Sequence, residues 1–204
     1  MAPESPDDAA TANEAAKGAL IEALARLQEA VLWKLDGISD YDLRRPLTAT
    51  GSNLLGIVKH LAAVQAGYFG ECFGRPFPHP MPWFEPQAPV NADMWVTPQE
   101  STASIIELYR ASWEHAVETF AVTPGDRTGL VPWWPADRNR PSLITLLVHV
   151  SVETARHAGH LDIVRELIDE RAGRFADDRS MPHDDEIDWA AYRAQVQEAA
   201  DAVR

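Results

Sequence analysis

The segment ETARHAGHLDIVRE, residues 153–166, places one carboxylic acid and two imidazoles in a stretch with the apolar spacing of a helix. Glu153 and His157 are four residues apart, so their side chains can meet on one face of that helix. This is the spacing by which a helix offers two ligands to a divalent cation. A carboxylate oxygen and an imidazole nitrogen suit Zn²⁺, Ni²⁺ or Fe²⁺ better than Ca²⁺. The segment therefore predicts part of a metal site.

Two ligands do not hold a metal ion well, and His60 is the candidate for the third. Apolar Ile57 and Val64 share its helix face, so the imidazole should point into the protein, where a missing partner costs about a few kcal/mol. Three protein ligands with an open fourth position form the catalytic arrangement of such metals. The alternatives are that His60 is a hydrogen-bonded core histidine and that Glu153 and His157 lie on a solvated helix face.

Other residues are candidates for roles around this site. His160 and His149 share the helix face of Glu153, within about 80° of rotation, and either could support a ligand or handle a proton. Arg156 is the candidate anchor for a substrate carboxylate, with a surface ion pair as the alternative. Tyr68 and Trp134 are the candidates for lining the binding cavity, although the tryptophan could instead serve core packing.

The apolar periodicity predicts the elements that must position these residues. Helices are expected at residues 11–35, 52–72, 97–120 and 142–170, with a short final helix at 187–203. Thr50 or Ser52 should cap the second helix and Ser142 the fourth, while TPQE at 97–100 reads as a capping box. A proline-rich stretch at 75–89 and the PWWP segment cannot continue a helix and are expected to be loops.

These elements predict an all-α fold, a four-helix bundle with long loops and a short C-terminal helix. No segment shows the strict alternation of a strand, and an up-and-down arrangement of the helices is expected. The connection between the second and third helices is long enough to cross the bundle or to form a lid. Residues 1–10 should be a frayed terminus, and residues 11–204 a single domain.

Composition narrows the function classes. The net charge of −13 argues against nucleic-acid binding, because such a surface repels phosphate backbones. The sequence has neither an apolar run of about 18 residues nor a secretory signal, so no membrane association is expected. Cys72, the one cysteine, rules out an internal disulfide and is expected to be a packing residue at a helix end. A cytoplasmic protein is expected.

Two segments, TATGSNLLGIVKHLAAVQAGYFGECFGRP and LLVHVSVETARHAGHLDIVRELID, resemble the DinB-like superfamily of four-helix metalloproteins, in particular its actinobacterial branch. The resemblance implies a divalent metal held by His60, Glu153 and His157. Many members carry a histidine where this chain has Glu153, and mycothiol-dependent maleylpyruvate isomerase is a relative that carries glutamate there. Characterised relatives are often S-transferases or isomerases that use a low-molecular-weight thiol, and some dimerise, so a homodimer is one of the states the resemblance allows.

The expected function is that of a metal-dependent thiol S-transferase, with zinc as the expected ion and nickel or iron as alternatives. The thiol is expected to be mycothiol, and the partner substrate a small electrophilic molecule. His160 and Arg156 are the expected catalytic residues. The alternatives are a metal-dependent hydrolase or isomerase at the same site, or a bundle that binds a small molecule or a metal without catalysis.

Overall fold

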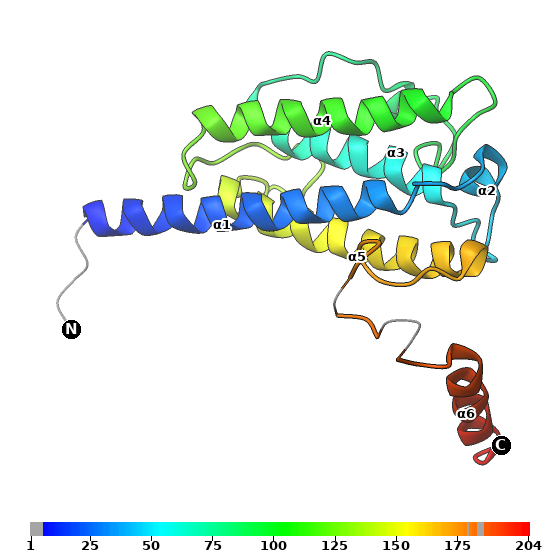
Figure 1. Ribbon diagram of the computed structural model, residues 1–204. Coiled ribbons are helices and arrows are strands. Elements are labelled where there is room, and N and C mark those ends of the chain that lie inside the picture. Colours follow the sequence, from blue (N-terminus) through cyan, green and yellow to red (C-terminus); the bar gives the residue numbers. More distant parts are fainter. Residues whose placement is uncertain (1–5, 179, 183–185) are drawn as a thin grey trace.

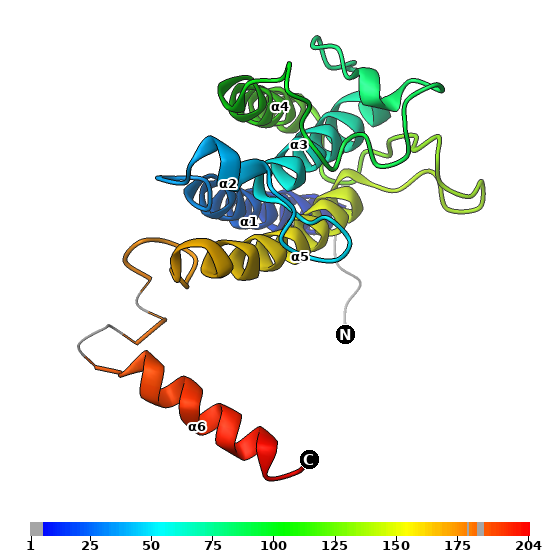
Figure 2. The ribbon, with the colours of Figure 1, turned by 90° about the vertical axis from the view of Figure 1, so that its right-hand side faces the viewer.

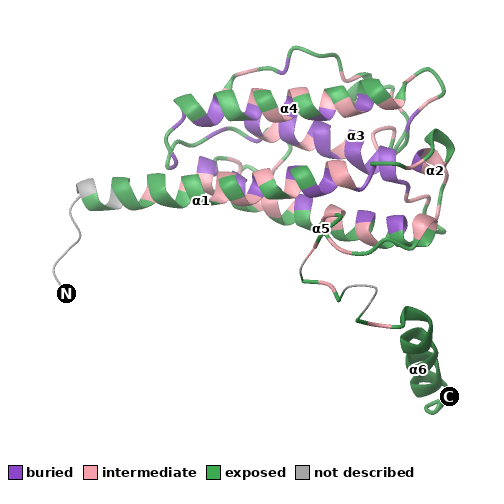
Figure 3. Ribbon diagram, in the orientation of Figure 1, coloured by how far each residue is buried: buried purple, intermediate pink, exposed green. Residues whose placement is uncertain are grey.

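The computed structural model describes residues 6–178, 180–182 and 186–204. The described residues form helices and loops without a strand, apart from an isolated antiparallel bridge between Thr128 and Ser142. The predicted all-α fold class is confirmed. Four long helices lie side by side (Figures 1 and 2): α1 (Pro6–Trp33), α3 (Leu54–Gln65), α4 (Thr102–Val122) and α5 (Leu143–Asp169). Their facing sides are buried and their outer sides exposed (Figure 3).

The helix directions follow from which ends pack together. Leu54 at the start of α3 and Ile105 near the start of α4 share one core cluster. Phe69, beyond the end of α3, packs against Phe120 near the end of α4, with ring centroids 4.8 Å apart. The two helices are therefore parallel, whereas an up-and-down bundle requires them to be antiparallel, so that part of the prediction is wrong. The proline-rich connection is the physical reason, because it returns the chain along the length of the bundle, from the end of α3 to the start of α4 (Figure 1).

The helix starts agree in part with the capping predictions. Ser142 caps α5 as expected, accepting a hydrogen bond from the backbone N–H of Thr145. Asn53, and not Thr50 or Ser52, caps α3. The predicted capping box at 97–100 is a turn, in which the Thr97 N–H donates to the Glu100 carboxylate, and α4 begins after the cap Ser101. The Glu100 carboxylate also forms an ion pair with a buried lysine of α3, Lys59.

Four short helical segments depart from the predictions, one of them a 3₁₀ turn, Pro82–Phe84, in the proline-rich stretch that was expected to be a loop. Beyond Gln65 the chain continues through a π-helical segment, Ala66–Gly70, and a 3₁₀ turn, Glu71–Phe73, where a continuous α-helix was expected. The short helix α2 (Asp40–Arg44) lies in a stretch expected to be a connection. The C-terminal helix α6 (Trp189–Asp201) agrees with the predicted segment 187–203.

Two expectations concern the ends of the chain and the membrane. Helix α1 begins at Pro6, within the segment expected to be frayed, and residues 1–5 of that segment lie outside the described residues. Every helix in the described part of the chain is too short or too polar to cross a bilayer.

Candidate metal site and its surroundings

The three predicted metal ligands come together between α3 and α5. Glu153 Oε1 lies 3.5 Å from His60 Nε2 and 3.1 Å from His157 Nε2. The centroids of the two imidazole rings are 4.9 Å apart, and the ring planes are tilted by 60°. One potential ligand atom from each residue lies within 4.8 Å of the other two. Two antiparallel helices thus bring together residues that are 93 positions apart in the sequence.

The two separations between the carboxylate and the imidazoles fit a small divalent cation. Ligands about 2.1 Å from a tetrahedral zinc ion lie roughly 3.4 Å from one another. The two carboxylate–imidazole distances of 3.5 and 3.1 Å are close to that value. The side chains of His60, Glu153 and His157 are 21%, 33% and 12% exposed, so a molecule from solvent can reach the cluster. One carboxylate and two imidazoles suit zinc, nickel or iron and leave at least one coordination position for an exogenous ligand.

Asp93, which the sequence interpretation missed, holds the outer nitrogen of His60. The His60 Nδ1–H donates a hydrogen bond of 2.7 Å to Asp93 Oδ2. This bond fixes the ring orientation and leaves Nε2 to face Glu153. A carboxylate behind a ligand histidine is a common feature of metal sites. Asp93 lies in the connection between α3 and α4, and its spacing from His60 carries no periodic signal that could have revealed the contact.

The loop that carries Asp93 is clamped onto one face of α3. Asn53 Nδ2 donates to the Met94 carbonyl at 3.1 Å, and Lys59 Nζ donates to the carbonyls of Ala92 and Trp95 at 3.1 and 3.0 Å. Gly56 permits the close approach, because a Cβ atom at this position would lie 2.0 Å from the Met94 carbonyl oxygen. Polar contacts therefore bracket Asp93 on both sides and set its position beside His60.

The charges of the cluster shift the pKa values of its members. Burial lowers the pKa of His60, but the hydrogen bond and charge of Asp93, together with Glu153, outweigh burial and raise it above 6.5. Burial and the charge of His60 lower the pKa of His157, against the opposing effect of Glu153. The pKa of Glu153 is lowered, because the two histidines outweigh its burial. At neutral pH the cluster therefore contains an ionised carboxylate and one histidine that retains its proton more readily than the other.

These directions predict a pH dependence for metal binding. A metal binds the neutral imidazole, so His60 must lose its proton when an ion binds at Nε2. Because its pKa is raised, we expect affinity for Zn²⁺ to fall as pH drops through a value above the ordinary 6.5, with His60 releasing a proton per bound ion. Calorimetry in two buffers of different ionisation enthalpy measures the released protons. Zn²⁺ affinity that is constant across this range would contradict the prediction.

Replacing Asp93 by asparagine should separate charge from shape at this site. Asp93→Asn removes the carboxylate that raises the pKa of His60, so the pH midpoint for Zn²⁺ binding should move down. At a pH where His60 is neutral in both proteins, we expect affinity to fall about 10–100-fold, because the oriented ring is less well held and less basic. Competition with a chromophoric chelator measures both effects. The Glu85→Gln variant, in an exposed part of the same loop, serves as the control.

Aromatic residues lie one helical turn from the cluster. The Tyr68 hydroxyl accepts hydrogen bonds from the indole N–H groups of Trp133 and Trp134, at 3.2 and 3.1 Å. The Tyr68 ring contacts His149, which precedes Glu153 by four residues on α5, with ring centroids 4.8 Å apart. Trp134 also packs on His149, at 5.1 Å. The structure thus places Tyr68 and Trp134 on an aromatic wall beside the three candidate ligands.

The two predicted catalytic residues occupy different positions relative to the cluster. His160 is exposed, and its Nδ1 lies 3.5 Å from His157 Nδ1, so it adjoins the nitrogen of His157 that points away from Glu153. Arg156 is exposed on α5, on the solvent side of the helix. Cys72 is buried, as expected for a packing residue, and burial raises its thiol pKa to about 12, so it does not supply a reactive thiolate.

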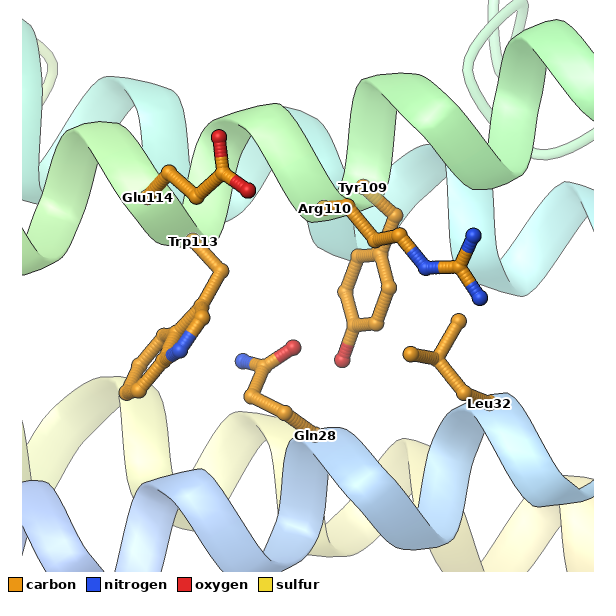
Figure 4. A pocket seen from close by; sticks show the side chains of 6 residues that line it. All are labelled: Gln28, Leu32, Tyr109, Arg110, Trp113 and Glu114. Carbon is orange, nitrogen blue, oxygen red and sulfur yellow. The ribbon is translucent and has the colours of Figure 1, made fainter.

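A small cavity lies elsewhere, between α1 and α4 (Figure 4). Gln28, Tyr109 and Trp113 contribute to its lining, and its volume of about 100 Å³ suits a few water molecules. The Gln28 amide is buried and has no hydrogen-bond partner within the described part of the chain. None of the lining residues belongs to the candidate metal site.

The all-α bundle is that of the DinB-like superfamily. A family model described as mycothiol S-transferase matches residues 19–170, a range that includes α3, α4, α5 and much of α1. The chain belongs to the mycothiol S-transferase family. No match to a curated protein was found.

Proposed function

We propose that this protein is a divalent-metal-dependent thiol S-transferase that uses mycothiol. The observation that carries the proposal is the convergence of His60, Glu153 and His157 at metal-ligand separations in a solvent-accessible position. The choice of mycothiol as the thiol substrate rests on the family to which the chain belongs. We propose zinc as the ion, with nickel or iron as alternatives that the same donor set accommodates.

The residues of the chain have distinct roles in this proposal. His60, Glu153 and His157 hold the ion, and Asp93 keeps the His60 ring in the orientation that directs Nε2 toward it. When bound, a divalent ion supplies positive charge that lowers the pKa of a nearby thiol, so that more thiolate is available at neutral pH. The partial exposure of the three side chains leaves room for the thiol to enter from solvent.

The transfer reaction needs neither an oxidant nor a reductant. The thiol loses its proton, its sulfur forms a carbon–sulfur bond with the electrophile, and the leaving group departs with the electrons of the bond that breaks. In this proposal His160, which contacts His157 at the solvent edge, receives the proton. Arg156 is the candidate for pairing with a carboxylate of the substrate from the exposed side of α5.

Tyr68 and Trp134 would line the binding site on its aromatic side. Their mutual hydrogen bond and their packing on His149 hold both rings one turn from Glu153. Such rings offer flat apolar surfaces with few freely rotating bonds, which suits the ordering of a small substrate. We propose that the substrate binds between the aromatic wall and the metal ligands.

The test is a thiol-transfer assay with purified full-length protein, Zn²⁺, mycothiol and monochlorobimane as the electrophile. We expect fluorescent adduct to form well above the rate without enzyme, to stop after removal of the metal by a chelator, and to return when Zn²⁺ is restored. Adduct formation that is unaffected by complete metal removal would contradict the proposal.

A second assay distinguishes the hydrolase alternative. A panel of esters and amides is incubated with the Zn²⁺-loaded protein in the absence of any thiol. Turnover of such substrates, without adduct formation from mycothiol and bimane, would replace thiol transfer with metal-assisted hydrolysis. Stoichiometric metal binding without either activity would instead indicate a non-catalytic binding protein.

A further inference from the structure

Helix α5 carries an apolar stripe on the side that faces away from the core. Val148, Val152, Ala155, Gly159 and Ile163 follow one another at intervals of three and four residues, so they share one face. Val152 is 64% and Ile163 60% exposed. A Cβ atom added at Gly159 would meet nothing within 4 Å, so this face opens to solvent. An apolar row of this length on a surface helix is typical of a contact surface.

The stripe borders a groove between α5 and α1. Its volume is about 410 Å³, and its floor includes the small residues Ala23, Ala30, Ala155 and Gly159. The charged residues Arg26, Lys34, Asp162 and Arg174 also line it. Small side chains on two neighbouring helices allow a third helix to approach closely. The groove is large enough to receive several apolar side chains of such a helix.

Helix α6 has a matching apolar face. Tyr192 and Val196 lie on one side of the helix axis, four residues apart. Tyr192 is 51% and Val196 53% exposed, and no residue of α6 is buried. In Figures 1 and 2, α6 stands apart from the four long helices. A helix of 13 residues is marginally stable alone in water, so this segment needs a surface to pack on.

The chain between the two helices already leads to the groove. After α5 ends at Asp169, the Gly173 carbonyl accepts a hydrogen bond from Lys34 of α1, and Phe175 lines the groove. Between Phe175 and the start of α6, an extended chain can span up to roughly 45 Å, which is more than the length of the stripe. A short tether also gives an effective concentration in the range of about millimolar, which favours this helix over a second copy of the chain.

We propose that α6 docks on the apolar stripe of α5 and its groove with α1, in the same chain. The contact buries both apolar faces at once and makes α6 part of the same domain as the bundle. It covers the face of α5 that lies away from His157 and Glu153, so the candidate metal site stays open. This proposal does not depend on the proposed enzymatic function.

Disulfide formation between introduced cysteines tests the contact in the full-length protein. Val196→Cys is combined in turn with Val148→Cys, Val152→Cys and Ile163→Cys, and the buried native Cys72 contributes little background. The matched control pairs Val196→Cys with Glu107→Cys, which is exposed on the outer side of α4 and has the same tether. We expect at least one α5 pair to oxidise within the monomer at least about tenfold faster than the control. Equal rates for all pairs, or disulfides formed mainly between chains, would overturn the proposal.

Hydrogen exchange provides a second measurement that needs no knowledge of register. Docked, the amides of α6 should exchange at least about tenfold more slowly than those of an unprotected peptide. Val196→Asp should abolish that protection, whereas Gln197→Asp, on the other face of the same helix, should preserve it. Unprotected α6 amides in the unmodified protein, or equal effects of the two substitutions, would contradict intramolecular docking.

Discussion

His60→Ala should abolish stoichiometric metal binding while the bundle remains folded. Removing this ligand leaves one carboxylate and one imidazole on α5, which hold a divalent ion poorly. The loss of affinity should exceed the roughly 10–100-fold cost of altering a residue that merely orients a ligand. Elemental analysis of protein loaded with Zn²⁺ and then desalted measures the retained metal, and circular dichroism checks the helical fold.

The matched control is His149→Ala, on the same helix as two of the ligands. His149 contacts Tyr68 and Trp134 and is not one of the three clustered residues, so this variant should retain the metal. Glu153→Gln tests the cluster from the opposite helix and should also lose metal. Undiminished stoichiometric Zn²⁺ in both the His60 and the Glu153 variants would reject the ligand assignment.

Lys59→Met should cost about 3–5 kcal/mol of unfolding free energy, the range measured when one partner of a buried ion pair is removed. The Lys59 side chain is 2% exposed and lies 2.9 Å from the Glu100 carboxylate. Its ammonium group also contacts the ring of Trp83, 4.3 Å from the centroid. Methionine fills the space of the stem but leaves the Glu100 carboxylate without its cationic partner and two loop carbonyls without their lysine donor. Urea denaturation in the presence of a chelator measures the effect without a contribution from metal.

Arg26→Met is the control for Lys59→Met. Arg26 forms an ion pair of 2.7 Å with Glu22, but both side chains are largely exposed, so its removal should cost less than about 1 kcal/mol. Because Lys59 also clamps the loop on either side of Asp93, its replacement should weaken Zn²⁺ binding in the fraction that remains folded. A stability loss no larger than that of Arg26→Met would show that the clamp contributes little.

The candidate metal ligands could be predicted because they lie on regular helices. Glu153 and His157 were identifiable because helix geometry brings positions four apart together, and His60 because it interrupts an apolar face. Asp93 could not be identified from the sequence, because an irregular loop has no period that relates its residues to a helix face. The clamp on α3 was missed for the same reason: its partners are mostly backbone carbonyls of the loop, which leave no trace in residue types.

The fold was likewise predictable in its helices and unpredictable in its loops. Apolar periodicity identified the long helices, but the relative direction of α3 and α4 depends on where a loop ends, and loop length alone permits either direction. The π-helical segment at Ala66–Gly70 was also missed, because adding one residue to a turn changes hydrogen bonding without changing composition. Capping was ambiguous between neighbouring polar residues, since Thr50, Ser52 and Asn53 all have suitable side chains.

The long connection formed by residues 74–101 has a consequence for folding kinetics. Because α3 and α4 are parallel, a tight turn cannot bring them into contact. The chain must close this long loop before contacts between the two helices form, and such topologies fold slowly. Asp93 reaches His60 when that closure is complete. A cation captured at the finished site would therefore prolong the lifetime of the native state and leave the refolding rate nearly unchanged.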